Sequence, residues 1–281
     1  MAAPPGTLYI IPTPIGNLGD LTLRALEVLK EVDLVAAEDT RTARKLFSRF
    51  AISTPLLSFH DHSPDHRIER LLQDLLDGLS IGLISEAGTP GISDPGYPLI
   101  RKVIDAGLPL VSLPGACAAI TALAGSGLPL HEYYFVGFLP VRKAARENRL
   151  LALRQIPATL VFYESPRRLP ATLAALEKVF GNRRICIGRE LTKIHEEYLR
   201  GHLRELIAAN EDRHWRGEIT LMVEGATEKA DAPADVGMVG ERLRQLQDEG
   251  VLSVRDMVNQ LAEEFPEWRR KDIYALVLQT G

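Results

Sequence analysis

Short apolar runs alternate with amphipathic segments through the first 125 residues or so of the chain. The runs are too short for buried helices and predict strands at Leu8–Ile11, Leu34–Ala37, Leu56–Phe59, Ile81–Ile84 and Leu108–Leu113. Because a helical segment separates each strand from the next, these strands are expected to form a parallel sheet.

Helical periodicity is clearest where apolar residues recur at i, i+3, i+4, i+7, i+8 and i+11, a single apolar face. Those residues are Ile68, Leu71, Leu72, Leu75, Leu76 and Leu79. Further helices are predicted at Leu21–Val32 with Asp20 as its N-cap, from about Thr42 with Asp39 or Thr40 as its cap, and at Tyr97–Ala106.

The pattern changes from about Ala124, where Gly125, Gly127 and Pro129 interrupt the chain. Strands are predicted at Tyr133–Gly137, Thr159–Tyr163, Arg184–Gly188, Glu196–Leu199 and Glu218–Glu224, and helices at Lys143–Gln155, Pro166–Phe180 and Leu203–Asn210. Several of these strands follow one another directly, so a mixed sheet is expected. The predicted fold is α/β, with a parallel-sheet domain (1–122), a mixed-sheet domain (123–227), and a linker with a helical appendage (228–281). The appendage helices are expected near 238–249, 253–264 and 270–279.

Three of the predicted strands of the first domain run into loops of small residues. The loop 85–96 holds three glycines, two prolines and the carboxylates Glu86 and Asp94, and similar loops follow at 12–19 and 114–119. Such loops at the carboxyl ends of parallel strands suit a ligand, although a rigid turn would also use glycine and proline. Neither a Rossmann fingerprint nor a Walker loop is present, so the sequence makes no case for a pyrophosphate site. Cys117 in the third loop is expected to be a small buried side chain rather than a nucleophile, since no histidine is near it in sequence.

Two adjacent carboxylates, Glu38 and Asp39, end the second strand and are followed by Arg41. They could orient a hydroxyl group or take its proton. Asp39 could instead cap the next helix while Arg41 pairs with a carboxylate, and the two interpretations are compatible.

The overall charge does not mark a nucleic-acid-binding protein, because 33 Lys and Arg stand against 37 Asp and Glu, a net charge of −4. Basic residues are nevertheless clustered. The clusters are Arg41, Arg44, Lys45 and Arg49; Arg142, Lys143, Arg146 and Arg149; Arg167 and Arg168; and Arg269, Arg270 and Lys271 after Trp268. Each cluster could contact RNA phosphates or be a solvated helix face.

The two cysteines have no metal-ligand spacing, which fits a reducing cytosol. No signal peptide or membrane-spanning run is present in the sequence given, and a cytoplasmic protein without membrane association is expected. His60, Asp61 and His62 could be metal ligands, but a polar loop is favoured because no third histidine is near, and no metal is expected.

The loops and turns of the chain contain a set of short motifs. They are Thr-Pro-Ile-Gly-Asn (13–17), Ala-Glu-Asp-Thr-Arg (37–41), His-Asp-His (60–62), Ala-Gly-Thr-Pro and Ser-Asp-Pro-Gly (87–90, 93–96), Pro-Gly-x-Cys-Ala-Ala-Ile (114–120), Phe-Tyr-Glu-Ser-Pro-x-Arg-Leu (162–169), Arg-Glu-Leu-Thr-Lys (189–193) and Gly-Glu (217–218). Taken together, these motifs resemble those of the tetrapyrrole-methylase-type class of S-adenosylmethionine methyltransferases. Within that class they are similar to the branch that acts on small-subunit ribosomal RNA.

This resemblance implies two α/β domains with S-adenosyl-L-methionine in the cleft between them, a homodimer, and 2′-O-methylation of a cytidine ribose in the decoding region of 16S rRNA. It assigns the cofactor to Pro12, Ile15, Gly16, Ser85, Glu86, Ala87, Gly88, Pro114, Gly115, Cys117 and Ala118, with Phe162 or Tyr163 from the second domain. The catalytic candidates are Glu38, Asp39, Arg41, Glu190 and Lys193, with Glu164 as a further carboxylate. RNA contacts are expected from Arg44, Arg142, Lys143, Arg146, Arg167 and Arg189.

Three positions depart from the pattern of that branch: Glu86 stands where Asp is expected, Ala116 where Pro is expected, and Arg167 where His is common. Glu86 keeps the carboxylate but is one methylene longer. Two other functions stay open at this point, a tetrapyrrole methyltransferase and a non-catalytic ribosome-assembly factor with the same fold.

Overall fold

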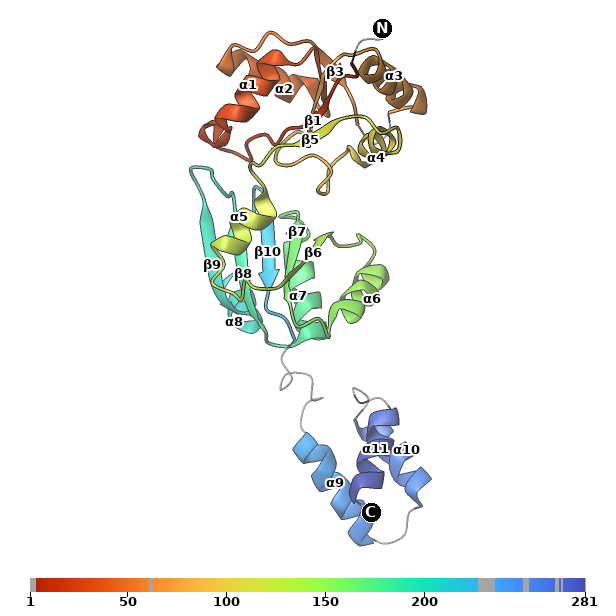
Figure 1. Ribbon diagram of the computed structural model, residues 1–281. Helices are drawn as coiled ribbons and strands as arrows, with labels where there is room; N and C mark the ends of the chain where they lie inside the picture. Colours follow the sequence, from red (N-terminus) through yellow and green to blue (C-terminus); the bar gives the residue numbers. More distant parts are fainter. Residues whose placement is uncertain are drawn as a thin grey trace. The chain divides into compact units, whose positions relative to one another are not determined.

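The structure is a computed structural model that describes residues 4–60, 63–226, 236–249, 253–265, 268 and 270–280. The chain divides into two compact units, Met1–Glu224 and Gly225–Gly281. Both sheets belong to the first unit, and the described residues of the second unit form three helices (Figure 1). The division of the sequence at residues 122 and 227 stays a prediction.

The first sheet has five strands, β1 (Leu8–Ile10), β2 (Leu34–Ala37), β3 (Leu56–Ser58), β4 (Ile81–Ile84) and β5 (Leu110–Ser112). Their order is β3-β2-β4-β1-β5, and every neighbouring pair is parallel, which confirms the predicted parallel sheet. Strands β4 and β1 are central, so the small-residue loops that follow them open in the middle of the carboxyl edge of the sheet.

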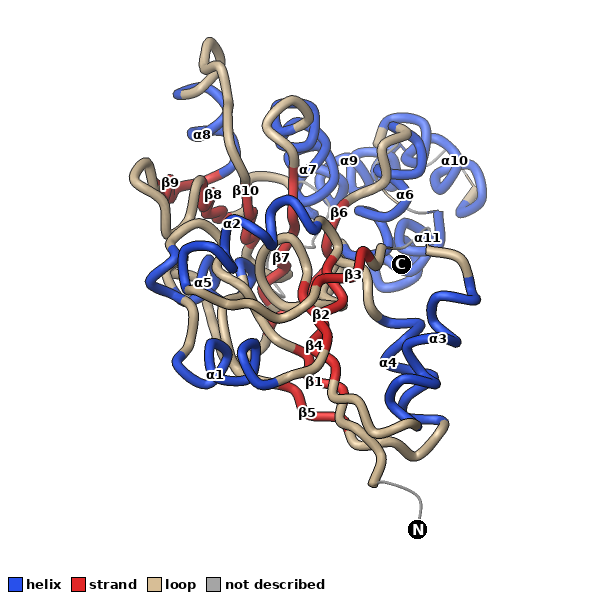
Figure 2. Tube along the Cα trace, turned by 90° about the horizontal axis from the view of Figure 1, so that it is seen from above, coloured by secondary structure: helices blue, strands red, loops and turns tan. Residues whose placement is uncertain are grey.

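Helices cover both faces of this sheet. Helices α1 (Leu23–Glu31) and α2 (Thr40–Phe50) lie on one face, and α3 (Asp65–Leu76) and α4 (Tyr97–Asp105) lie on the other (Figure 2). The strands are therefore buried from both sides, which explains why they read as continuous apolar runs.

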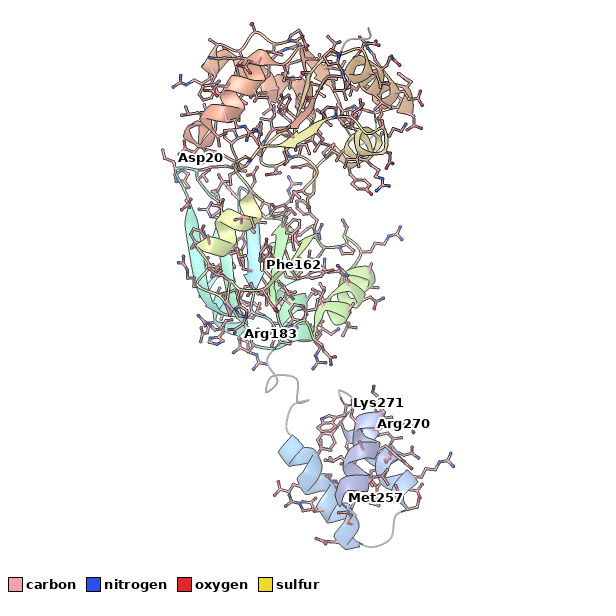
Figure 3. All side chains as sticks on the ribbon, viewed as in Figure 1. Asp20, Phe162, Arg183, Met257, Arg270 and Lys271 are labelled. Atoms are coloured by element: carbon pink, nitrogen blue, oxygen red, sulfur yellow. The ribbon has the colours of Figure 1, made fainter. Side chains whose placement is uncertain are left out.

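The helix starts test two cap predictions. Asp39 accepts the Arg41 N–H at 2.7 Å and caps α2, as predicted, although the helix begins at Thr40. Asp20 as the cap of the first helix is wrong, because Asp20 ends a 3-10 turn, η1 (Leu18–Asp20), shown in Figure 3. That turn, capped by Asn17, moves the start of α1 to Leu23, and Thr22 is the N-cap.

The second sheet contains β6 (Tyr133–Phe138), β7 (Thr159–Glu164), β8 (Arg184–Arg189), β9 (Glu197–His202) and β10 (Ile219–Val223). The order is β6-β7-β10-β8-β9. The β6–β7 pair is parallel and the other pairs are antiparallel, which confirms the predicted mixed sheet.

Alternation along β7 separates the two faces of this sheet. Leu160 and Phe162 face a core shared with α6 (Lys143–Leu153), α7 (Leu169–Phe180) and α8 (Leu203–Ala209). The intervening Val161 and Tyr163 face α5 (Ala118–Ala124). Helix α5 directly follows the first sheet in the chain but packs on the second.

The second unit has its own core. Helices α9 (Val236–Glu249), α10 (Val254–Glu264) and α11 (Arg270–Thr280) enclose Leu243, Leu261 and Trp268. All three lie close to their predicted positions. Among the helices of the described residues, none combines the length and the apolar character that a membrane span requires.

Candidate active site

A cavity of about 340 Å³, here called the central cavity, lies in the first unit between the two sheets. Its walls come from the loops after β1, β4 and β5, and from the strands β6, β7 and β10 with their adjoining turns. The lining residues are Ile15, Ala87, Gly88, Thr89, Ile92, Ser93, Asp94, Cys117, Ala118, Phe138, Tyr163, Glu164, Ser165, Pro166, Leu191, Gly217, Glu218, Ile219 and Thr220.

Close contacts between backbone loops shape the first-sheet side of the cavity. Thr13 and Gly88 form an isolated antiparallel bridge, with both N–H···O bonds at 2.9 Å. Gly88 has φ +80, a conformation that glycine adopts without strain. A Cβ on Gly115 would lie 2.6 Å from Cβ of Pro12, so the third loop packs on the first with no room for a side chain.

Tyr163 joins the second sheet to the start of α5. Its hydroxyl accepts the Ala119 N–H at 3.1 Å, and Phe135 and Phe138 lie edge-on to its ring at 5.1 and 5.6 Å. Burial, helped by the nearby Cys117 thiol, raises the pKa of Tyr163 above its ordinary value. The phenol therefore stays neutral and serves as a fixed wall of the cavity.

Glu190, Lys193 and Glu218 form a group at the cavity edge, here called the carboxylate–lysine cluster. Nζ of Lys193 lies 2.8 Å from Oε1 of Glu190 and 3.1 Å from Oε2 of Glu218. Oε1 of Glu190 also accepts the Glu218 N–H at 2.9 Å. Partial burial raises the pKa of Glu190, but the hydrogen bonds from Lys193 and the Glu218 N–H outweigh it and leave the pKa below its ordinary value.

Glycines let this cluster approach its surroundings. A Cβ on Gly16 would lie less than 3.0 Å from Cγ of Lys193, and a Cβ on Gly217 would lie less than 3.0 Å from the Glu190 carboxyl carbon. The Asn17 N–H donates to Oγ1 of Thr192 at 3.1 Å, which ties the loop after β1 to the loop after β8. The cluster therefore sits where loops of both sheets meet.

The other catalytic candidates, at the end of β2, lie among the loops of the first sheet. Oε2 of Glu38 accepts the Glu86 N–H at 3.1 Å. Nη2 of Arg41 lies 2.8 Å from Oδ2 of Asp39, and this pairing brings the pKa of Asp39 down to about 2. A carboxylate with so low a pKa is a weak base. None of these residues lines the central cavity.

A second cavity of about 300 Å³ lies on the first sheet alone. Ser85 and Glu86 line it together with Thr13, Thr42 and Lys45. The Thr13–Gly88 bridge contributes one residue to each cavity, so the bridge lies between them.

The residues that the resemblance assigned to the cofactor are distributed over several positions. Those that line the central cavity are Ile15, Ala87, Gly88, Cys117, Ala118 and Tyr163. Ser85 and Glu86 line the second cavity, while Pro12, Gly16, Pro114 and Gly115 line neither. Phe162, labelled in Figure 3, is fully buried in the core on the face of β7 that is turned away from the cavity. Adjacent strand residues point to opposite faces of a sheet. Of the two alternatives, Tyr163 is therefore the residue that lines the cavity.

The structure separates the basic residues expected to bind RNA into accessible and inaccessible ones. Arg44, Arg142, Lys143 and Arg167 are exposed. Arg146 is only 8% exposed, since it lies on the inner side of α6 four residues before the buried Leu150, so it does not present its charge to a ligand. Arg189 is held by Glu197, with its Nε 2.9 Å from Oε2 of that carboxylate, which Arg213 also pairs with.

Glu164 is the most buried of the carboxylate candidates, at 3% exposed. Oε1 accepts the Ser165 N–H at 2.7 Å, and Oε2 accepts the Thr172 hydroxyl at 2.6 Å. Arg168 completes the arrangement, with Nε 3.2 Å from Oε1. These contacts indicate that Glu164 fixes the turn between β7 and α7.

Several residues of the cavity were given no role from the sequence: Asp94, Leu191 and Glu218, which lie within the quoted motifs, and Phe138 and Thr220, which do not. Glu218 had a usable signal in the Gly-Glu motif (217–218), which directly precedes β10. Phe138 had none, because its orientation depends on a strand irregularity that no periodicity reveals. His60 is described, but Asp61 and His62 lie outside the described residues; among the residues described, no group of three metal-ligating side chains occurs.

Residues 7–207 match the family described as Tetrapyrrole (Corrin/Porphyrin) Methylases. The chain is 45% identical to the ribosomal RNA small subunit methyltransferase I of Micromonospora olivasterospora, over 98% of this chain and 89% of that one. The chain belongs to the ribosomal RNA small subunit methyltransferase I family, within the tetrapyrrole methylases.

A second relative in this family, from Halalkalibacterium halodurans, is 48% identical over 80% of this chain and 78% of its own length. Among solved structures, a uroporphyrin-III C-methyl transferase from Thermus thermophilus, complexed with S-adenosyl homocysteine, superposes with a TM-score of 0.56 at 17% identity, covering 78% of this chain and 97% of that one. At that identity the superposition establishes a common fold, and it confirms the tetrapyrrole methylase fold expected from the sequence.

Proposed function

We propose that this protein transfers a methyl group from S-adenosyl-L-methionine to the 2′-hydroxyl of a cytidine ribose in 16S rRNA. The observation that carries the proposal is identity of 45% along nearly the whole chain to a ribosomal RNA small subunit methyltransferase I. The choice of cytidine and of the 2′-oxygen, and the decoding region as the place of modification, rest on the motif resemblance.

The central cavity fits the methyl donor in character. Ile15, Ala87 and Leu191 supply apolar walls. The carboxylates of Asp94 and Glu218 are on its lining and favour a cation. A structure of the same fold is complexed with S-adenosyl homocysteine, the product that the donor leaves. When bound, the donor supplies a methyl group activated by its sulfonium.

The protein must then place a weak nucleophile in line with that methyl group, and positioning alone supplies much of the acceleration. Glu218 is the best-placed carboxylate to accept the hydroxyl proton, because its side chain is 73% exposed and the residue lines the cavity. Lys193 holds Glu218 in place and offers an ammonium group to a neighbouring phosphate. Glu38, beside the second cavity, is the alternative base.

Exposed cations on both sheets suit a polyanionic substrate. Of the basic residues expected to bind RNA, the exposed ones are Arg44, Arg142, Lys143 and Arg167. We further propose a cytoplasmic homodimer that acts on the small ribosomal subunit, on the strength of the motif resemblance. Sedimentation of the purified protein tests the dimer directly.

The testing experiment offers labelled S-adenosyl-L-methionine with small subunits that lack ribose methylation, with free rRNA, and with uroporphyrinogen III. The tetrapyrrole is included because the family match is described by tetrapyrrole substrates. Label recovered as 2′-O-methylcytidine from RNA supports the proposal. Label only in the tetrapyrrole, or none with intact subunit binding, would overturn it in favour of a tetrapyrrole enzyme or an assembly factor.

Matched variants assign the proton acceptor. Glu218→Gln and Glu38→Gln each remove one carboxylate while keeping size and hydrogen-bonding ability. We expect Glu218→Gln to lower kcat by roughly 10²-fold, in the range of general-base contributions, while Glu38→Gln lowers it less. The reverse order would assign the proton to Glu38.

A further inference from the structure

Phe138 ends the edge strand β6 and lies on the rim of the central cavity. Its side chain lines the cavity, yet the residue is 57% exposed. The inner side of its ring meets Tyr163 edge-to-face, with centroids 5.6 Å apart and an interplanar angle of 61°. A phenylalanine in a core would be almost fully covered, so more than half of the surface of this residue is left for a partner.

The backbone is built to hold the ring in this position. The β6–β7 register shifts between Phe135 and Gly137, a bulge-like irregularity that leaves Val136 outside the pairing, two residues before Phe138. Gly137 has φ +72, and a Cβ there would lie 2.9 Å from Oγ of Ser93 on the loop after β4. Bulges change the direction of the side chains that follow them and recur beside active sites. A strand without the bulge would direct residue 138 to the other face of the sheet.

The surroundings of the ring match one kind of partner. Arg142 and Lys143 follow within five residues and are exposed. On the facing loop, Ile92 lines the cavity and is 41% exposed. An exposed aromatic ring next to exposed cations is the arrangement on which proteins stack unpaired bases of RNA while they contact its phosphates.

We propose that Phe138 is the stacking platform for the base of the acceptor nucleotide, which it holds at the cavity rim so that the ribose hydroxyl is directed inward. The inference rests on the proposed function and deepens it by assigning a positioning residue for the RNA. The donor is bound by the inner walls of the cavity, and the exposed face of Phe138 is left for the substrate that approaches from outside.

The test compares Phe138→Ala, Phe138→Leu and Phe138→Trp with wild type on undermethylated small subunits. Stacking requires a flat ring, so we expect Ala and Leu to lower kcat/KM for the subunit by roughly tenfold to a hundredfold, and Trp to retain most of the activity. The affinity for S-adenosyl homocysteine, measured by calorimetry, is expected to stay within about twofold of wild type in all three. Tyr133→Ala removes a 48% exposed ring at the other end of β6 and is the matched control, expected to leave kcat/KM unchanged.

Three results would overturn the inference. If Leu were as active as Trp, apolar bulk rather than stacking would explain the residue. If the product bound tenfold more weakly to Phe138→Ala, the ring would be a donor contact. If Phe138→Ala methylated RNA with the same kcat/KM as wild type, Phe138 would not be a stacking platform, although the proposed function would stand. A wild type that methylates no RNA would instead overturn the proposed function itself.

Discussion

The ammonium group of Lys193 lies between two carboxylates and is 2.8 Å from the nearer one, Glu190. Glu190 has φ +49, in the left-handed region, and Gly16 leaves space for the Lys193 stem. A non-glycine residue held in that conformation beside a cavity indicates that the surrounding contacts determine its place. The carboxylate–lysine cluster is therefore held in place by local backbone geometry as well as by charge.

Removing the cation from this cluster should impair the enzyme more than the fold. In Lys193→Met, Glu190 and Glu218 are left facing each other without a countercharge. We expect kcat/KM for methyl transfer to fall about tenfold or more, and the free energy of unfolding to fall by about 1 kcal/mol, since the pair is partly exposed. Lys178→Met removes a comparable ammonium group, 3.4 Å from Glu147, between the neighbouring helices α7 and α6, and should leave activity unchanged because neither residue lines either of the two cavities. Equal activity of the two variants would contradict a functional cluster.

Gly217 is predicted to tolerate no side chain. Its φ is +83, and a Cβ there would displace the Glu190 carboxyl group. We expect Gly217→Ala to lower the free energy of unfolding by about 2–3 kcal/mol and to reduce methyl transfer strongly. Gly107→Ala separates the effect of backbone strain from the effect of displacing Glu190. Gly107 has φ +65, but a Cβ there would meet open space. That variant should lose about 1 kcal/mol and keep its activity. Denaturant titration and turnover measurements check both.

Asp39 should make the stability of the protein depend on pH in the acid range. Its pKa is about 2 in the folded protein against an ordinary 3.8, through its hydrogen bonds and ion pair with Arg41. A depressed pKa contributes stability above about pH 4, and that contribution is lost as the pH falls toward 2. Asp39→Asn keeps an equally good N-cap but cannot ionise. Between pH 4 and 2, the free energy of unfolding of wild type should therefore fall more steeply than that of Asp39→Asn. If the two free energies fell in parallel over this range, the pKa of Asp39 would not be lowered in the folded protein.

The two thiols should differ in their reactivity. Cys186 is fully buried, and burial raises its pKa to about 11, so it should resist alkylation in the native state. Cys117 is partly exposed and lines the central cavity, so it should be alkylated first. Saturating S-adenosyl homocysteine should slow the labelling of Cys117 if the cavity is the donor site. Peptide mass spectrometry follows both residues, and unfolded protein labelled at both sites is the control. Labelling of Cys117 at an unchanged rate would place the donor elsewhere.

The elements of the fold could be predicted because their signals are local. Buried parallel strands such as Ile81–Ile84 are short apolar runs, and the α3 face repeats with helical spacing. The displaced start of α1 was missed because a polar Asp20 suits a cap and a turn equally well. A local pattern predicts a helix but not the sheet on which the helix packs. Helix α5 follows the first sheet in the chain and packs on the second, so sequence order does not predict the packing either.

The candidate site was less accessible to prediction because burial and pairing are tertiary properties. Arg146 and Arg142 look alike in the sequence, but only Arg142 faces outward. Phe162 and Tyr163 are adjacent, and only the side of the sheet decides which one meets the cavity. The motifs lie in loops that line the cavities, whereas the division of those loops between two cavities depends on the Thr13–Gly88 bridge.

The chain passes from the first sheet to the second once, through the few residues between β5 and α5. Pro114 and Gly115 lie in this crossing, and Cys117 and Ala118 at its end are walls of the central cavity. In the part of the chain that the structure describes, the link between the sheets and one wall of the cavity are therefore the same short peptide. A ligand seated against that wall contacts the backbone that joins the two layers, so binding at the cavity bears on the connection as well as on the walls.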